Sequence, residues 1–388
     1  FRRVLFRSTG SWIIDGTLAN IAWAPSLVSY NLSWEKIRTW NAGVDFGLFN
    51  NRLTGSFDYY IRKTDDMVGP SEKLPVVLGT AVPSSNNTNL KTFGWELELM
   101  WKDRLNNGLN YSARFTLADS RTKITRYSNP SGLIDGFYAG KYVGEIWGYE
   151  TIGIAQSDQE MAEHIGRLIN GGQSNLGQDW KAGDIMYKDL NEDGKIDAGS
   201  RTLQDHGDLK RIGNSTPRYN VGLELAADWK GFDIRMFWQG TLKRDYFQGS
   251  YYFWGANGRQ GPWFSTALKG HDDYFRNDEA SPLGTNLNSY YPRPLFNTDK
   301  NQQSQTKYLQ DASYLRLKNL QIGYSLPHNI VQKMGMQHLR IFASGENLFT
   351  ITSLIDFFDP ESIEGGSWGH GNVYPLSRTF SFGLNVTF

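Results

Sequence analysis

Residues 374–388 read YPLSRTFSFGLNVTF, and from Thr379 onward polar and apolar side chains alternate. The apolar members are large, and the residues between them are small or polar. Successive side chains of an extended strand point to opposite faces, so this pattern separates an apolar face from a wet one. The segment predicts an amphipathic β-strand whose apolar face carries Phe380, Phe382, Leu384, Val386 and Phe388.

The same two-residue period recurs upstream, in pairs of segments joined by turn residues. Apolar residues alternate over 95–101, an Asn107-Gly108 turn signal follows, and the alternation resumes over 109–117. The alternation predicts nine strands, each about ten to fifteen residues long. Further pairs of this kind occupy 35–59, 219–238 and 308–350.

The predicted connections between these strands alternate in length. The short ones lie at 49–52, 105–108, 229–231 and 327–335. The long ones lie at 65–88, 123–216, 246–306 and 351–375. Tight turns at one end of a sheet and large loops at the other are typical of outer-membrane barrels. We therefore expect an all-β fold, the C-terminal portion of a transmembrane antiparallel β-barrel with long extracellular loops.

Two soluble all-β folds are the alternatives. A β-sandwich also has alternating strands, but it hides its apolar faces between two sheets, and its loops need not alternate in length. A β-propeller repeats every forty to fifty residues, and the sequence has no such repeat. Soluble strands also average about five or six residues, shorter than those predicted for this chain. The pattern favours the barrel.

The composition excludes several classes of protein. The 388 residues include 40 basic and 40 acidic side chains, so there is no charge excess to attract nucleic acid. Cysteine is absent, which excludes disulfide frameworks, thiolate zinc sites and cysteine nucleophiles. No run of eighteen apolar residues predicts a membrane helix. The chain instead has 13 Trp, 20 Tyr, 22 Phe and 41 Gly.

The beginning of the chain does not share the strand pattern. The first eight residues, FRRVLFRS, are basic, and neither an initiator Met nor a signal peptide is present. We expect residues 1–34 to be a truncated start and an extracellular loop, with the first eight residues non-native. Residues 35–388 are then the barrel portion, which needs more than nine strands to close. A complete cytosolic protein with an unusual start is the alternative.

The longest connection contains DLNEDGKID at 189–197. Oxygen ligands at alternating positions, with glycine at the sixth, suit a structural Ca2+ or Mg2+. The twelfth position is Ser200 instead of Glu, so we expect a calcium-type loop within 183–200 and not a full EF-hand. The alternative is an Asx-rich turn whose side chains bond their own backbone. The predicted ligands are the side chains of Asp189, Asn191, Asp193 and Asp197 and the carbonyl of Lys195.

Aromatic residues also gather in the long loops. Between 246 and 264, Gly, Asn, Arg and Gln interrupt any alternation, so these rings cannot form a lipid-facing strand. Exposed rings stack on sugars or hold peptides, whereas buried rings would pack the loops into a small extracellular core. The candidate ligand-contacting rings are Trp147, Tyr149, Tyr251, Tyr252, Trp254 and Trp263.

The sequence contains no constellation typical of an enzyme. The six His are scattered without an HExxH spacing, and there is no G-x-S-x-G. We therefore predict no enzymatic activity and no organic cofactor. Charged residues of the predicted strands are interpreted as the polar lining of a wide lumen: Glu96, Glu98, Arg114, Glu224, Asp228, Asp233 and Arg235.

From Ser33 to Phe388, the chain resembles the barrel of SusC/RagA-type TonB-dependent outer-membrane transporters. Several stretches carry this resemblance, and they follow the order of the family. They are SWEKIRTWNAGVDFGLFNNRLTGSFDYYIRKTDDM (33–67), GDIMYKDLNEDGKID (183–197), ASYLRLKNLQIGYSLP (312–327), LRIFASGENLFTIT (339–352), DPES (359–362) and YPLSRTFSFGLNVTF (374–388).

The resemblance implies a 22-stranded barrel in the outer membrane of a Gram-negative bacterium, with its lumen filled by an N-terminal plug. A TonB box near the N-terminus would couple the plug to the TonB complex, and a SusD-like surface lipoprotein would close the barrel. The cargo would be an oligosaccharide or a peptide. Nucleic acid is not an expected partner, whereas outer-membrane lipid is.

These features lead to one hypothesis and two alternatives. The hypothesis is that the chain forms wall and loops of a TonB-dependent nutrient importer. One alternative is an outer-membrane enzyme barrel, for which no catalytic spacing is found. The other is an adhesin or a soluble glycan-binding β-protein. In the soluble protein, other parts of the molecule would cover Phe380, Phe382 and Leu384.

Overall fold

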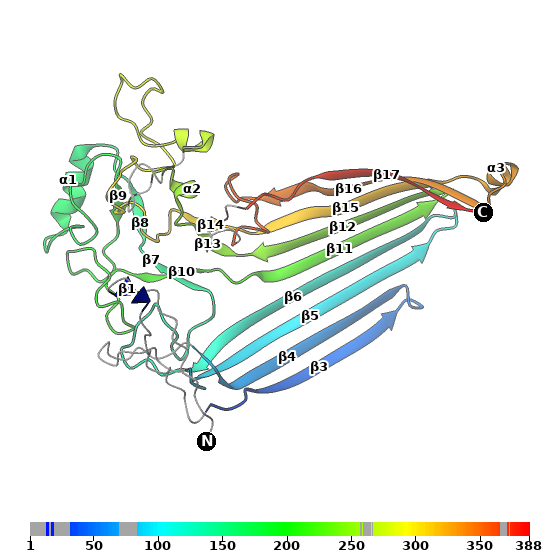
Figure 1. Cartoon of the computed structure of the whole chain (residues 1–388), viewed down its shortest axis with the longest axis horizontal. Helices are drawn as coiled ribbons and strands as arrows, with labels where there is room; N and C mark the ends of the chain where they lie inside the picture. Colours follow the sequence, from blue (N-terminus) through cyan, green and yellow to red (C-terminus); the bar gives the residue numbers. More distant parts are fainter. Residues whose placement is uncertain are drawn as a thin grey trace.

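The computed structural model consists of a long curved sheet with a compact head of loops at one end (Figure 1). Most of the predicted start, 1–34, lies outside the residues that the structure describes, and so does the candidate ring Trp263. The structure describes residues 13–14, 17–18, 32–69, 84–256, 258, 265, 267–364, 371 and 373–388.

Nine antiparallel strands form the sheet, in the order β17-β16-β15-β12-β11-β6-β5-β4-β3. Each strand pairs with the strands that precede and follow it along this sheet, so the arrangement is a meander. It confirms the nine predicted strands. Their bounds are β3 Lys36–Leu48, β4 Leu53–Met67, β5 Thr88–Arg104, β6 Asn110–Arg126, β11 Arg218–Trp229, β12 Phe232–Lys243, β15 Tyr314–Ser325, β16 His338–Thr352 and β17 Thr379–Thr387.

The connections alternate in length as predicted. The tight ones lie at one end of the sheet and comprise 49–52, 105–109, 230–231 and 326–337, the last with the short helix α3 (His328–Lys333). Asn50, Asn51 and Gly108 adopt positive φ angles of 59°, 62° and 86°, which Asn and Gly tolerate best. The long connections leave from the opposite end, at 68–87, 127–217, 244–313 and 353–378.

The register of backbone pairing gives the sheet one apolar and one polar face. Directly paired residues of adjacent strands share a face, so each row across the sheet can be read from the pairing. One row across eight strands is Val44, Phe57, Leu97, Leu117, Val221, Gly240, Leu315 and Ile351. The next row, on the opposite face, is Asp45, Ser56, Glu98, Thr116, Gly222, Gln239, Arg316 and Thr350.

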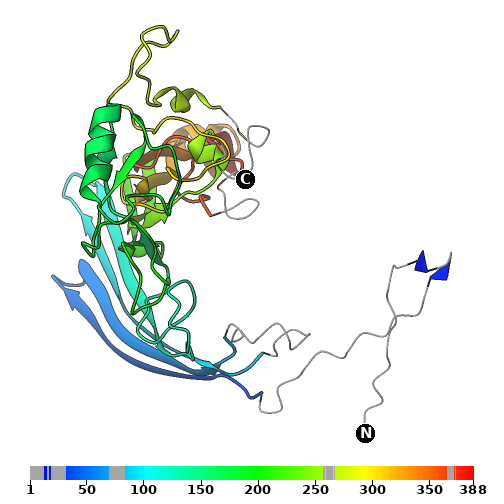
Figure 2. The same cartoon turned by 90° about the vertical axis from the view of Figure 1, so that its left-hand side faces the viewer.

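The sheet bends into a crescent, which Figure 2 shows from its end. Two hollows, of about 510 and 560 Å³, lie along its polar residues. The first is lined by Ser56, Glu96, Glu98 and Thr116 among others, and the second by Asp228 and Arg235. The polar face is therefore the concave one, as the lining of a lumen should be.

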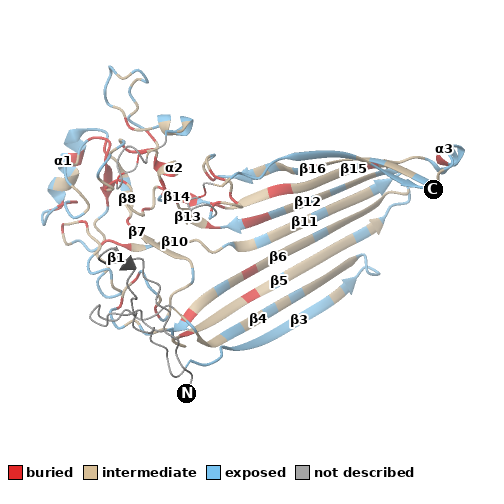
Figure 3. Cartoon of the chain, viewed as in Figure 1, coloured by how far each residue is buried: buried red, intermediate tan, exposed pale blue. Residues whose placement is uncertain are grey.

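The apolar face is bare. Phe380, Phe382 and Leu384 are 69%, 84% and 67% exposed, and no second sheet covers the face in the described part of the chain. Figure 3 shows the edge strands β3 and β17 coloured almost wholly as exposed. The described residues therefore provide none of the cover over these side chains that the soluble β-protein alternative predicts.

The head is built from the long connections and has its own core. Tyr187, Phe253 and Tyr308 are fully buried in it. We call the described residues of 127–217 and 244–313 the loop head. Its elements are β7 Glu145–Gly148, β8 Thr151–Ile154, α1 Asp158–Arg167, β9 Ile185–Tyr187, β10 Lys210–Asn214, β13 Asp245–Phe247, α2 Tyr251–Trp254, η3 Lys269–Asp272 and β14 Leu309–Asp311.

Two further short strands, β1 Ile13–Ile14 and β2 Thr17–Leu18, pair with each other. Among the described helices, none has the length and apolar character that a membrane crossing needs.

A charge on the apolar face should destabilise the barrel more than the same charge on the polar face. Phe382 lies near the middle of β17, so Phe382→Lys in the full-length protein should cost about 2–4 kcal/mol of folding free energy in lipid. The control is Ser381→Lys, one residue away and on the polar face, which should cost about 1 kcal/mol or less. Urea unfolding in lipid vesicles measures both. Equal losses would contradict the assignment of the faces.

Candidate functional site

A cavity of about 460 Å³ lies in the loop head, between its two constituent loops. Its volume falls within the range of sites for small ligands. We call it the head cavity. Charged, amide and aromatic side chains dominate its lining, which includes Asp135, Lys141, Glu145, Trp147, Tyr149, Arg201, Asp299 and Gln302.

Ion pairs and hydrogen bonds fix the charged walls of the head cavity. Arg201 donates from Nε and Nη2 to the two carboxylate oxygens of Asp135, at 2.9 and 2.8 Å. Glu145 accepts from the hydroxyl of Tyr138 at 2.6 Å and from the amide of Tyr142 at 3.0 Å. Burial and the nearby Glu145 raise the pKa of Tyr138 to about 12, so its hydroxyl remains a donor at neutral pH.

The predicted rings Trp147 and Tyr149 both line the head cavity. The Oγ of Ser304 donates to the carbonyl of Trp147 at 2.8 Å, and the Tyr149 amide donates to the Ser304 carbonyl at 2.8 Å, so the second loop holds both residues in place. Tyr149 is only 4% exposed, and its ring lies 5.4 Å from that of Tyr187 in the core. Trp147 is half-buried. Trp147 therefore presents the larger aromatic surface to a ligand.

The remaining described candidates lie on α2, away from the head cavity lining. Trp254 is 6% exposed and packs edge-on against Tyr308, with 4.6 Å between ring centroids. It borders a second cavity of about 430 Å³, beside Tyr291. Tyr251 and Tyr252 are half-buried, with centroids 4.4 Å apart. The structure does not bring the predicted rings to one site, and ligand contact by any of them stays a prediction.

A buried ionic cluster ties the two parts of the loop head together. Asp184 is fully buried, and it accepts from Arg293 at 2.7 Å, Lys300 at 2.9 Å and Asn301 at 2.9 Å. Burial alone would raise the pKa of Asp184, but these hydrogen bonds outweigh it and lower the pKa below the usual value. Lys300 also donates to two backbone carbonyls and lies 4.6 Å from the Trp180 ring.

The calcium-type loop shows the contacts of an Asx-rich turn. The amide of Gly194 donates to Asp189 at 2.8 Å, and the amide of Lys195 donates to Asp193 at 3.1 Å. The Lys195 ammonium lies 2.6 Å from Asp197. Within the described residues, no group of three or more His, Cys, Asp or Glu side chains is arranged to hold a metal.

The carboxylates of Asp189 and Asp208 bear on whether this loop could hold a cation. The Oδ1 atom of Asp189 is buried and has no hydrogen-bond partner, which is uncommon for a buried carboxylate oxygen. Asp208 is fully buried beside the loop and accepts from the amides of Leu190 and Asp197 at 2.7 and 2.9 Å. Both carboxylate oxygens of Asp208 are thus occupied by backbone amides of the loop, and binding of a cation by the loop stays a prediction.

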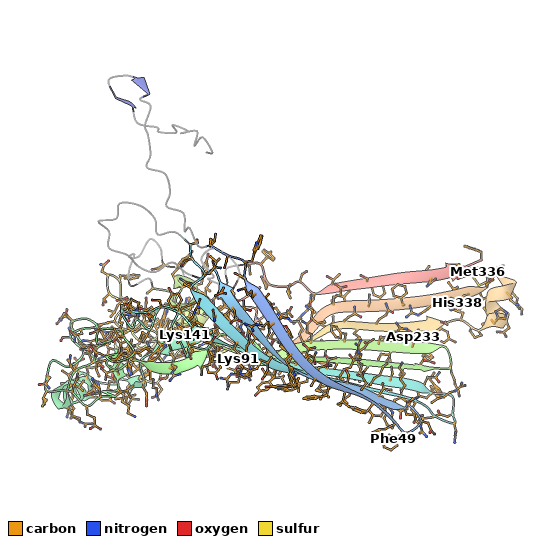
Figure 4. All side chains as sticks on the ribbon, turned by 90° about the horizontal axis from the view of Figure 1, so that it is seen from below. Phe49, Lys91, Lys141, Asp233, Met336 and His338 are labelled. Carbon is orange, nitrogen blue, oxygen red and sulfur yellow. The ribbon has the colours of Figure 1, made fainter. Side chains whose placement is uncertain are left out.

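Ion pairs cross the polar face of the wall. Arg114 donates to both carboxylate oxygens of Glu98, at 3.0 and 2.9 Å. Arg340 donates to Asp233 on the neighbouring part of the sheet at 2.8 and 2.5 Å. In Figure 4, Asp233 lies toward the tight-turn end, near His338, whereas Lys141 lies in the loop head. Charged lumen-side residues are therefore distributed along the wall, as predicted.

Two of the quoted sequence stretches meet in space. Arg316, in β15, lies 2.8 Å from Asp359 and 2.9 Å from Glu361, and Lys318 lies 3.0 Å from Glu361. The side chains of Arg316 and Asp359 are only 4% and 9% exposed. The DPES stretch at 359–362 therefore fixes the last long loop, 353–378, to the polar face of the wall.

Several residues of the head were not predicted from the sequence. They are Asp184, Lys300, Asp208 and the charged residues that line the head cavity. A signal did exist for Asp184, because a lone acid directly precedes the apolar strand Ile185–Tyr187. The partners of these residues lie in the other loop, and no local pattern points to them.

The chain matches one family model, described as TonB dependent receptor-like, beta-barrel, over residues 6–348. It is 29% identical over 380 residues to TonB-dependent receptor P3 of Formosa agariphila, covering 92% of this chain and 34% of that protein. It is 27% identical over 373 residues to TonB-dependent receptor SusC of Bacteroides thetaiotaomicron, covering 94% of this chain and 33% of that protein.

A solved structure of the RagAB peptide transporter has the same fold. The TM-score is 0.70 at 23% identity, and the match covers 98% of this chain and 38% of that one. The chain spans about a third of the length of the curated relatives it matches.

Removing the buried carboxylate at Asp184 should loosen the loop head. Asp184→Asn leaves Lys300 buried without its counter-charge, which should cost about 3–5 kcal/mol. Faster hydrogen exchange in 181–188 and 298–303 of the full-length protein would report this. The matched control is Asp135→Asn, which breaks an exposed pair and should change exchange little. Unchanged exchange in Asp184→Asn would contradict the role of the cluster.

Proposed function

The chain belongs to the family of TonB-dependent receptor-like β-barrels, which are outer-membrane proteins, and on that premise we propose that the whole protein imports a nutrient across the outer membrane. The observation that carries this proposal is the polar, concave face that runs across all nine strands. Import needs a wet path, and a solid sandwich core offers none. This chain contributes wall and extracellular loops to that path.

We propose that the cargo is an oligosaccharide or a peptide. The head cavity supports this class, because it combines an aromatic surface at Trp147 with charged and amide groups. Sugars and peptides both present apolar patches beside hydrogen-bonding groups, so they need this mixture. The relative of known structure is described as a peptide transporter, which agrees with a peptide as one of the two.

The proposed partners follow from the same family relationship. A SusD-like surface lipoprotein would close the barrel over the loop head, and the TonB complex would supply energy through a plug domain. The relatives are named as receptors and transporters, which supports transport without covalent chemistry. Binding in the head would then precede passage along the polar face.

We further propose that the loop 183–200 holds a structural cation, Ca2+ or Mg2+. The ligands would be Asp189, Asn191, Asp193 and Asp197, with the carbonyl of Lys195. The unpartnered Oδ1 of Asp189 and the buried Asp208 support the site. A cation would stiffen the head by linking carboxylates that otherwise repel one another, and it would not take part in catalysis.

Trp147→Ala should weaken cargo binding at least about tenfold, which corresponds to about 1.4 kcal/mol. The reason is loss of the aromatic surface of the head cavity. Isothermal titration of the full-length receptor with its oligosaccharide or peptide measures the affinity. The control is Trp34→Ala, since Trp34 is highly exposed and lies outside the lining of the head cavity. If the affinity of Trp147→Ala is unchanged, the cargo binds at a place other than the head cavity.

The cation is tested separately, on the full-length receptor. Asp189→Ala with Asp193→Ala should lower bound calcium by one equivalent and make the loop 183–200 more sensitive to protease. Elemental analysis and limited proteolysis measure these changes. Asp158→Ala with Asp278→Ala, in the same head but outside the motif, serves as the matched control. Metal content that equals the control would leave the Asx-rich turn as the correct interpretation.

A further inference from the structure

Four basic residues form one row across the extracellular ends of β3 to β6. The pairing register sets Arg38 opposite Lys63, Lys63 opposite Lys91, and Lys91 opposite Lys123. Neighbouring strands lie about 5 Å apart, so these cations are first neighbours across the sheet. Like charges directly opposite one another destabilise a sheet. We therefore expect a negatively charged group beside this row, which would offset the repulsion between the cations.

The row lies on the apolar face, immediately beyond its last aromatic positions. The preceding row on the same face is Trp40, Ile61, Phe93 and Arg121. Trp40 packs edge-on against Tyr59, with centroids 6.4 Å apart, as in an interfacial aromatic girdle. Figure 4 shows Lys91 where the sheet meets the loop head. The row thus borders the lipid at the level of the outer-leaflet headgroups.

Protein groups neutralise only one end of the row. Arg38 lies 2.5 Å from Asp65, an ion pair at the edge of the sheet. In the described part of the chain, Lys63, Lys91 and Lys123 form no ion pair with a carboxylate. Lys123 and Arg121 share only the ring of Tyr142, at 5.5 and 4.4 Å. Among the described residues, therefore, no carboxylate pairs with these three adjacent lysines on the lipid-facing surface.

We propose that this row binds the phosphate group of a phosphorylated outer-leaflet lipid. The lipid's acyl chains lie against the apolar face, and its phosphate bridges Lys63, Lys91 and Lys123. Clusters of basic residues beside a membrane surface attract anionic headgroups, and phosphate oxygens accept from several ammonium groups at once. The site is independent of cargo binding, because it lies on the opposite face from the lumen.

The experiment uses the full-length receptor in detergent, titrated with monophosphoryl lipid A and followed by native mass spectrometry. The variant is Lys63→Gln/Lys91→Gln/Lys123→Gln. Its affinity for the lipid should fall on the order of 100-fold, because the variant loses the attraction of three lysines to the headgroup. The control Lys181→Gln/Lys269→Gln/Lys333→Gln removes three exposed lysines outside the row and should bind like the unmodified protein.

Three outcomes would overturn the proposal. The first is equal lipid affinity in the triple variant and in the control. The second is equal affinity of the unmodified protein for a dephosphorylated lipid with the same acyl chains, which would show that phosphate is not recognised. The third is full displacement of the lipid by millimolar inorganic phosphate, which would indicate a small-anion site. The single variant Lys91→Gln, with an expected loss of about fivefold, keeps the test valid if the triple variant does not fold.

Discussion

The pairing register of the nine strands is the constraint on which the rest of the structure depends. A slip of one residue would move every apolar side chain of a strand to the polar face. In lipid, the backbone groups must also be paired with one another, because no water is present to satisfy them. The row from Val44 to Ile351 shows that these two demands select the same register across eight strands.

The loops leave from that wall, but interactions of a different kind stabilise them. Outside the membrane, they can bury aromatic rings in a core of their own, and they do so around Tyr187 and Tyr308. Charged groups then fix the parts relative to one another. Asp184 and Lys300 join the two halves of the head, and Arg316 with Asp359 joins the last loop to the wall. A head held in this way presents a cavity with preformed walls.

Much of the wall could be predicted from the sequence, because a period of two and a Gly or Asn turn are local signals. The strand number and the alternation of tight and long connections came from such signals. The contacts of the head could not be predicted in this way, since Asp184 and Asn301 are 117 residues apart. The rings Tyr149 and Trp254 show the same limit, because aromatic residues in a loop have the same sequence signature whether they line a site or fill a core. The basic row is intermediate: each lysine stands next to the apolar positions of its own strand in the sequence, but only the pairing register shows that the lysines are aligned.

One face of this sheet should contact lipid, and the other should not. These 388 residues contain no cysteine, so a fluorophore can be attached at single cysteines introduced along β5, at positions 95 to 99, once any cysteine elsewhere in the full-length protein has been replaced. Quenching by nitroxide groups on lipid acyl chains then measures contact with the bilayer. We expect strong quenching at 95, 97 and 99 and weak quenching at 96 and 98. Quenching without this two-residue period, or strongest at 96 and 98, would contradict it.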